Sequence, residues 1–114
     1  MNTKIVYTYE ARQDLRDIYA YIAFKLLVPE TAVKFIDKIL EGARSLETLP
    51  KRNPLYREEP WHSKGVYFLP VHNYLVFYTV DDKTNTVSVI RIMYARRDVT
   101  RQIEQTSERK DERY

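Results

Sequence analysis

Apolar positions in the first quarter of the chain change from a strand-like to a helical spacing. Residues 4–8 are rich in β-branched and aromatic side chains and predict a short first strand. From residue 11 onward, apolar residues recur at steps of three or four, which is typical of one face of an α-helix. These positions are Ala11, Leu15, Ile18, Ile22 and Leu26. The pattern therefore predicts a strand followed by an amphipathic helix.

A second helical pattern begins at Pro29. Proline suits the first position of a helix, and Glu30 beside it favours the positive end of the helix dipole. A broad apolar stripe follows, formed by Ala32, Phe35, Ile36, Ile39, Leu40, Ala43 and Leu46. Pro50 limits this helix to about Leu49. Because few residues separate the two helices, we expect an antiparallel helical hairpin.

The remainder of the chain predicts a loop and then three strands. Residues 50–64 hold three of the five prolines and predict an irregular loop. The strand-like runs are residues 65–71, 73–80 and 86–94, with polar turns at 72–73 and 81–85. The middle run is apolar on both faces, which indicates a central strand.

The order β-α-α-β-β-β predicts an α+β fold, with the hairpin on one face of a mostly antiparallel four-stranded sheet. The opposite face would be partly exposed. Side chains alternate along a strand, so Ile90 and Ile92 are expected to face the helices and Arg91 to emerge opposite. Residues 99–106 could form a short helix. We expect one domain over residues 1–106 and a polar, frayed tail over 107–114.

Composition limits the chemistry. The chain has 114 residues, a formal net charge of +3, no cysteine and two histidines. A disulfide framework is excluded, and neither a metal site nor a cofactor is expected. No segment resembles a leader or a membrane span, so a cytoplasmic protein is expected. Residues 91–101 carry four arginines against one aspartate, 4 − 1 = +3, and mark a place where an anionic partner could bind.

Several segments together resemble the RelE/ParE superfamily of bacterial toxins. They are the helix ARQDLRDIYAYI, the helix start PETA, the strand NYLVFYTV and the ending RIMYARRD, in this order. The resemblance covers residues 4–103. It implies the toxin half of a type II toxin–antitoxin pair. The superfamily contains RelE-like ribosome-dependent mRNA nucleases and ParE-like inhibitors of DNA gyrase, so the fold alone does not choose the activity.

At three positions this sequence has a different residue from the one that the nuclease branch has. RelE-like enzymes resemble one another in having an arginine on the central strand, where this chain has Leu75, and a tyrosine after the last strand, where it has Ile103. The residue before the terminal tyrosine, Tyr94, is a histidine in YoeB and Met93 here. Arg97 matches a basic position of RelE. RNA cleavage needs proton transfer as well as phosphate binding, so these departures favour a binding protein over an enzyme.

Two sets of residues remain candidates for a site. A nuclease would use Tyr94, Arg97 and Arg91; a surface that binds a target or an antitoxin would add Arg96 and Arg101, together with cationic residues of the proline-rich loop. The loop residues are Lys51, Arg52, Arg57 and Lys64. Either histidine, His62 or His72, could act as a general base, but their spacing suggests no catalytic partner.

The resemblance implies a set of partners. The first is a cognate antitoxin, acidic and partly disordered when free, which folds as it binds. The favoured target is DNA gyrase, inhibited by binding alone. The alternative target is the ribosome with its mRNA, and a further alternative is an inactive homologue that only binds the antitoxin. The antitoxin, and not this chain, would contact DNA directly. No membrane partner is expected.

Overall fold

The computed structural model describes residues 3–95, which form two layers. The elements are β1 (Lys4–Tyr7), α1 (Tyr9–Ala20), the π-helical turn η1 (Tyr21–Lys25), α2 (Pro29–Arg44), the 3-10 turns η2 (Ser45–Glu47) and η3 (Pro50–Arg52), β2 (Tyr67–Val71), β3 (Tyr74–Asp81) and β4 (Thr86–Tyr94). This order confirms the predicted α+β fold. The predicted helix and tail beyond residue 95 lie outside the described residues.

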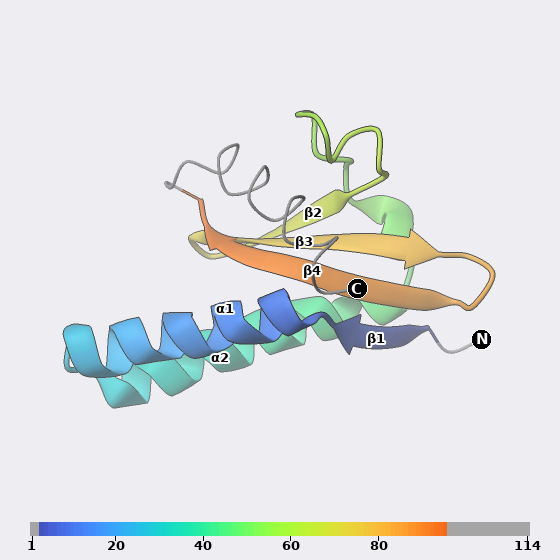
Figure 1. The fold of residues 1–114 in the computed structure, drawn as a ribbon. Helices are drawn as coiled ribbons and strands as arrows, with labels where there is room; N and C mark the ends of the chain where they lie inside the picture. The colour runs from blue at the N-terminus through green and yellow to red at the C-terminus, as the bar shows by residue number, and fades with distance from the viewer. Residues whose placement is uncertain (1–2, 96–114) are drawn as a thin grey trace.

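The four strands form one sheet in the order β1-β4-β3-β2. β1 pairs with β4 in parallel, and the other two pairs are antiparallel. The predicted central strand is confirmed, since β3 lies between β4 and β2. Figure 1 shows α1 and α2 side by side along one face of the sheet, with the end of their hairpin projecting past the strands.

Local sequence explains where the helices begin. The Thr8 hydroxyl accepts a hydrogen bond from the Ala11 backbone N–H at 3.2 Å and donates one to the Ile90 carbonyl at 3.0 Å. Thr8 therefore caps α1 and also attaches its first turn to β4. Pro29 occupies the first turn of α2, as predicted.

The helices end differently from the prediction. The Leu26 N–H bonds the Tyr21 carbonyl at 3.1 Å, a π-helical spacing that rotates Leu26 off the stripe of α1 and leaves it half exposed. The second helix ends at Arg44 rather than near Leu49, because the chain tightens into η2 and then turns through a left-handed Leu49. Pro50 therefore indicated the position of the turn correctly, but the helix ends several residues before it.

The main core fills the space between the hairpin and the sheet. Its buried members come from α1, α2, η2, β3 and β4, and they are Ala11, Ile39, Ala43, Leu46, Tyr74, Val76, Tyr78, Val87, Val89 and Ile92. Ile5 and Tyr7 of β1 are partly buried and pack against this core. Gly42 allows a close approach of α2 to β2, because a Cβ there would lie 2.7 Å from Val71 Cγ2. The small residues at positions 42 and 43 thus set the distance between α2 and the sheet.

A second apolar cluster lies on the opposite face. The loop before β2 contributes Trp61 and Val66, which pack on Phe77 and Met93 with exposed fractions of 2% or less. The Tyr56 ring meets the Phe77 ring edge-on, with centroids 5.1 Å apart. The prediction of a partly exposed second face is therefore wrong over this region, because the proline-rich loop folds back to cover it.

A β-bulge changes the facing of residues in β4. Phe77 pairs with Arg91 and Tyr78 with Val89, so Ile90 is an extra residue between them. Ile90 packs with the second cluster while Ile92 packs with the main core. The prediction that both isoleucines face the helices is therefore wrong for Ile90, because simple alternation fails at a bulge, and it is confirmed for Ile92.

None of the helices described between residues 3 and 95 combines the length and the apolar character that crossing a membrane requires. Over the same residues there is no grouping of three or more histidine, aspartate or glutamate side chains suited to hold a metal ion.

Candidate functional site

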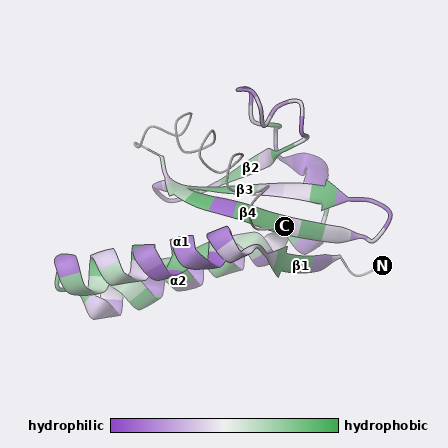
Figure 2. Cartoon of the chain, viewed as in Figure 1, coloured by the Kyte–Doolittle hydropathy of each residue, from purple (hydrophilic) through white to green (hydrophobic). Residues whose placement is uncertain are grey.

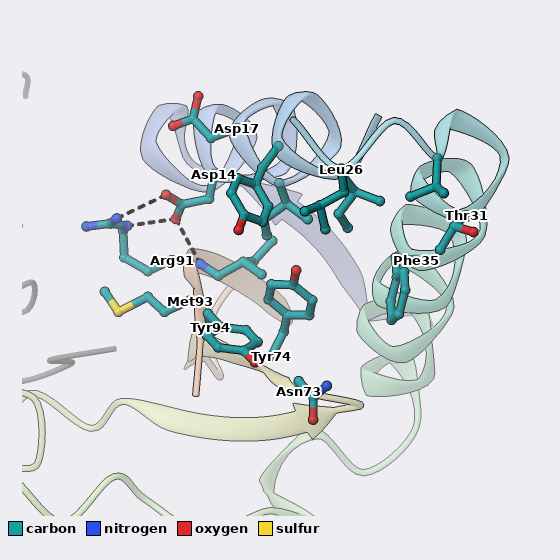
Figure 3. A pocket seen from close by; sticks show the side chains of 15 residues that line it. Asp14, Asp17, Leu26, Thr31, Phe35, Asn73, Tyr74, Arg91, Met93 and Tyr94 are labelled. Atoms are coloured by element: carbon teal, nitrogen blue, oxygen red, sulfur yellow. Dashed lines mark hydrogen bonds and ion pairs between the residues drawn. The ribbon is translucent and has the colours of Figure 1, made fainter. Parts of the chain in front are cut away.

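A groove of about 620 Å³ separates the helical hairpin from the ends of β3 and β4. Figure 3 shows α1, η1 and α2 on one side of this groove and the strand ends on the other. Its apolar walls come mainly from Tyr21, Leu26, Val28, Phe35, Tyr74 and Tyr94, and its polar rim from Asp14, Asp17, Thr31, Asn73 and Arg91. The groove combines a large apolar lining with few charges, which is typical of a surface that binds another molecule.

The charged end of the groove is a nearly buried ion pair. Arg91 Nε lies 2.7 Å from Asp14 Oδ2, and Arg91 Nη2 lies 3.0 Å from Asp14 Oδ1. The side chains are 15% and 12% exposed. Asp14 Oδ2 also accepts the Ile92 backbone N–H at 2.9 Å. One carboxylate therefore fixes the arginine and the strand beside the bulge, as the dashed lines in Figure 3 show.

The aromatic end of the groove is held by edge-on ring contacts. Tyr94 meets Tyr74 with ring centroids 5.6 Å apart, and Phe35 of α2 meets Tyr74 at 6.3 Å. Tyr94 also packs against the main core and is half-buried. The terminal tyrosine of β4 thus has a packing role in addition to lining the groove.

The predicted cationic residues do not converge on one surface. Lys51 forms an ion pair with Asp82 at 2.6 Å, in the turn that precedes β4, whereas Arg91 and Tyr94 lie at its far end. At roughly 3.3 Å per strand residue, about 25 Å separates the two ends.

Other predicted cations have structural contacts or lie elsewhere. Arg52 donates hydrogen bonds to the carbonyls of Ser45 and Thr48 and so holds the turn after α2. Arg57 and Lys64 are exposed on the loop that covers the second cluster. Arg96, Arg97 and Arg101, together with Ile103, lie outside the described residues.

The two strand positions that differ from the nuclease pattern are apolar in their surroundings as well. Leu75 pairs with Met93 across β3 and β4, and both belong to the second cluster under Trp61. His62 is exposed in the loop, and His72 lies in the β2–β3 turn, where its ring meets Phe35 edge-on. Neither histidine lies among the residues that line the groove.

Asp14 is a groove residue that the sequence analysis did not identify. It is 77 positions away from Arg91 in the sequence, so no local pattern connects the two. A signal was present, because Ala11, Asp14, Ile18 and Tyr21 follow one another at steps of three and four. An acidic residue within such a row indicates a paired, partly buried charge.

One family model matches most of the chain, and several solved structures share its fold. The family model described as the ParE toxin of the type II toxin–antitoxin system parDE matches residues 5–99. No curated protein matches the sequence significantly. Among solved structures, the chromosomal ParDE system of P. aeruginosa has a TM-score of 0.66 at 23% identity, covering 81% of this chain and 95% of that one.

Two further solved structures share the fold. The toxin–antitoxin complex RelBE2 of Mycobacterium tuberculosis has a TM-score of 0.58 at 22% identity, covering 82% of this chain and 99% of that one. The archaeal RelE–RelB complex of Pyrococcus horikoshii has a TM-score of 0.58 at 14% identity, covering 85% and 99%. At these identities the similarity concerns the fold.

Proposed function

The chain belongs to the ParE toxin family of type II toxin–antitoxin systems, and on this basis we propose that it inhibits growth by binding DNA gyrase. A cognate antitoxin neutralises it. Both the toxin and its target would lie in the cytoplasm. In this proposal the chain is a binding protein rather than an enzyme, and any contact with promoter DNA belongs to the antitoxin.

The main support for inhibition by binding, and against nuclease activity, comes from the surroundings of Leu75. The resemblance to RelE-like nucleases places a phosphate-binding arginine at this position, but here leucine packs with Met93 in an apolar cluster. Met93 is 2% exposed and has no proton to transfer. A side chain that enters catalysis by moving a proton must reach its substrate, so a buried methionine beside a leucine supports inhibition by binding.

The groove supports an antitoxin as the second partner. Its apolar lining suits the apolar side chains of a segment that folds on binding. The Asp14–Arg91 pair is already formed, so Arg91 keeps a protein partner before any ligand binds. We therefore assign the apolar part of the contact to the groove and its electrostatic part to the arginines at 96–101. A small acidic reading frame beside this one would provide the partner to test.

A supercoiling assay tests the target. Purified chain is added to gyrase, relaxed plasmid and ATP, and plasmid topology is measured over a range of toxin concentrations. The expected result is loss of supercoiling or accumulation of cleaved plasmid, and both effects should disappear on addition of the antitoxin. Unchanged supercoiling at excess toxin would refute the gyrase mechanism.

Arg97 and Tyr94 favour a ribosome-dependent mRNA nuclease as the second candidate, because they match basic and aromatic positions of that branch. The same preparation is added to a translating extract, and the mRNA is mapped by primer extension. The proposal expects intact mRNA. Cleavage within codons that is lost in Arg97→Ala and retained in Lys83→Ala, an exposed cation in the turn between β3 and β4, would replace gyrase inhibition with nuclease activity.

A further inference from the structure

The tip of the helical hairpin carries a run of exposed apolar side chains. We define the hairpin-tip patch as Phe24, Leu26, Leu27, Val28 and Val33, whose exposed fractions run from 41% to 78%. All residues from 24 to 31 are exposed. Apolar segments appear at this end of the hairpin in Figure 2, beyond the reach of the sheet. Nothing within the described chain covers this patch.

Backbone geometry at the tip is unusual for such side chains. Leu27 adopts φ = 59° and is 78% exposed. In this left-handed region a leucine is strained, whereas glycine or asparagine is not. Just before it, η1 replaces a regular helical turn with a π-helical one. Strained residues and π-turns cluster at functional positions, and a strained leucine whose side chain lies in solvent gains no burial within its own chain.

The outer part of the patch is separate from the groove. Leu26 and Val28 contribute to the groove lining, but Phe24, Leu27 and Val33 do not. Phe24 instead meets Tyr19 edge-on, with ring centroids 6.2 Å apart, on α1. A ligand confined to the groove would therefore leave the most exposed apolar residues of the tip uncovered.

We propose that the hairpin-tip patch binds a second copy of this chain in a two-fold symmetric dimer. The charges that flank its centre are self-complementary, since Lys25 precedes Leu27 by two residues and Glu30 follows it by three. Both are exposed. A two-fold axis passing near Leu27 places each lysine opposite the partner's glutamate, because a symmetric interface pairs i with j and j with i.

The size of the patch agrees with a weak dimer. The exposed fractions of its five residues amount to on the order of 500 Å² of accessible surface per chain. The flanking Lys25, Pro29 and Glu30 extend it toward the roughly 800 Å² per partner that a stable interface buries. We expect dissociation in the micromolar range, so that monomer and dimer exchange at working concentrations.

Analytical ultracentrifugation of the full chain tests the dimer, with Leu27→Asn as the main variant. Asparagine tolerates the left-handed conformation, so the substitution removes the apolar side chain without new backbone strain. The matched control is Leu49→Asn, since Leu49 is also left-handed (φ 49°) and 72% exposed, but lies outside the tip. We expect a monomer–dimer equilibrium that Leu27→Asn weakens at least tenfold and Leu49→Asn leaves unchanged. Phe24→Ser provides an independent second variant with the same expected direction.

Charge reversal tests the proposed pairing. Lys25→Glu and Glu30→Lys should each weaken dimerisation several-fold, and the double variant should restore it. A chain that stays monomeric up to about 200 µM would overturn the proposal, since a specific weak interface saturates below that range. Equal weakening by Leu27→Asn and Leu49→Asn, or no weakening by either tip variant, would also overturn the assignment of this patch as the interface.

Discussion

The buried Asp14–Arg91 pair makes a quantitative prediction for Asp14→Asn. The substitution keeps the size of the side chain but removes the charge that faces Arg91, whose side chain is only 15% exposed. It also replaces one of two acceptor oxygens that together bind Arg91 Nε, Arg91 Nη2 and the Ile92 N–H. The attachment of the strand beside the bulge to α1 is therefore weakened.

The expected cost follows from the number of contacts and their burial. A hydrogen bond to a charged group contributes about 1.5–3 kcal/mol, and breaking a fully buried ion pair costs about 3–5 kcal/mol. In the position of Oδ2, the amide oxygen of asparagine can still accept the bonds from Arg91 Nε and the Ile92 N–H, and the partial exposure of Arg91 lets water solvate it. We therefore expect Asp14→Asn to lower the free energy of unfolding by about 2–4 kcal/mol, a large part of the roughly 5–15 kcal/mol available to a domain.

Urea unfolding followed by fluorescence measures this change. The single tryptophan, Trp61, is 2% exposed in the second cluster, so its emission reports unfolding without added labels. Asp82→Asn is the matched control, because it makes the same substitution in an ion pair whose side chains are 51% and 72% exposed. We expect no measurable change for the control. A loss for Asp14→Asn below about 1 kcal/mol, or equal to that of the control, would refute the structural role of the pair.

Three further predictions concern individual contacts. Thr8→Ala should lower the free energy of unfolding by about 1–2 kcal/mol, because it removes both the cap of α1 and the hydrogen bond to Ile90; Thr8→Ser, which keeps the hydroxyl, should lose much less in the same urea assay. Gly42→Ala should destabilise by about 1 kcal/mol despite the better helix propensity of alanine, because its Cβ would meet Val71 Cγ2 at 2.7 Å; the double variant with Val71→Ala should remove this steric part of the cost, and an additive result would contradict it. Burial raises the pKa of the Tyr78 phenol above its ordinary value of 10.0, so the proton is held more tightly in the fold. This contribution to stability is complete below pH 10 and is lost as the pH rises through the higher folded pKa. Urea midpoints should consequently fall more steeply above pH 10 for the natural chain than for Tyr78→Phe, and parallel profiles would contradict the assignment.

The element order could be predicted from the sequence because it depends on periodicity and on turn residues. Helical spacing from Ala11 onward, Pro29 at a helix start and the polar turns between strands all act locally. The failures required non-local information. The exposure of Leu26 depends on a π-turn, and the facing of Ile90 depends on a bulge opposite Phe77 and Tyr78. Neither the π-turn nor the bulge produces a periodic pattern in the sequence from which it could be predicted.

The site was predicted less completely than the fold for the same reason. Arg91 and Tyr94 were identified from their place at the end of the last strand, and both line the groove. The opposite wall consists of residues from α1, η1 and α2 that are distant in sequence, and only the packing of the hairpin brings them together. On the second face, the loop before β2 places Trp61 over the sheet, which buries Met93 and partly buries Leu75.

The pairing of Arg91 changes the meaning of the basic stretch at residues 91–101. Its local charge of +3 includes one arginine that a carboxylate of α1 already neutralises. Setting Arg91 aside leaves three arginines and Asp98, 3 − 1 = +2, all beyond the groove in sequence. The groove itself offers apolar walls and a satisfied ion pair, so binding there depends on shape and on buried apolar area. Under the proposed function, we therefore expect the attraction of an acidic partner to come from the arginines at 96–101 and the apolar contact to come from the groove.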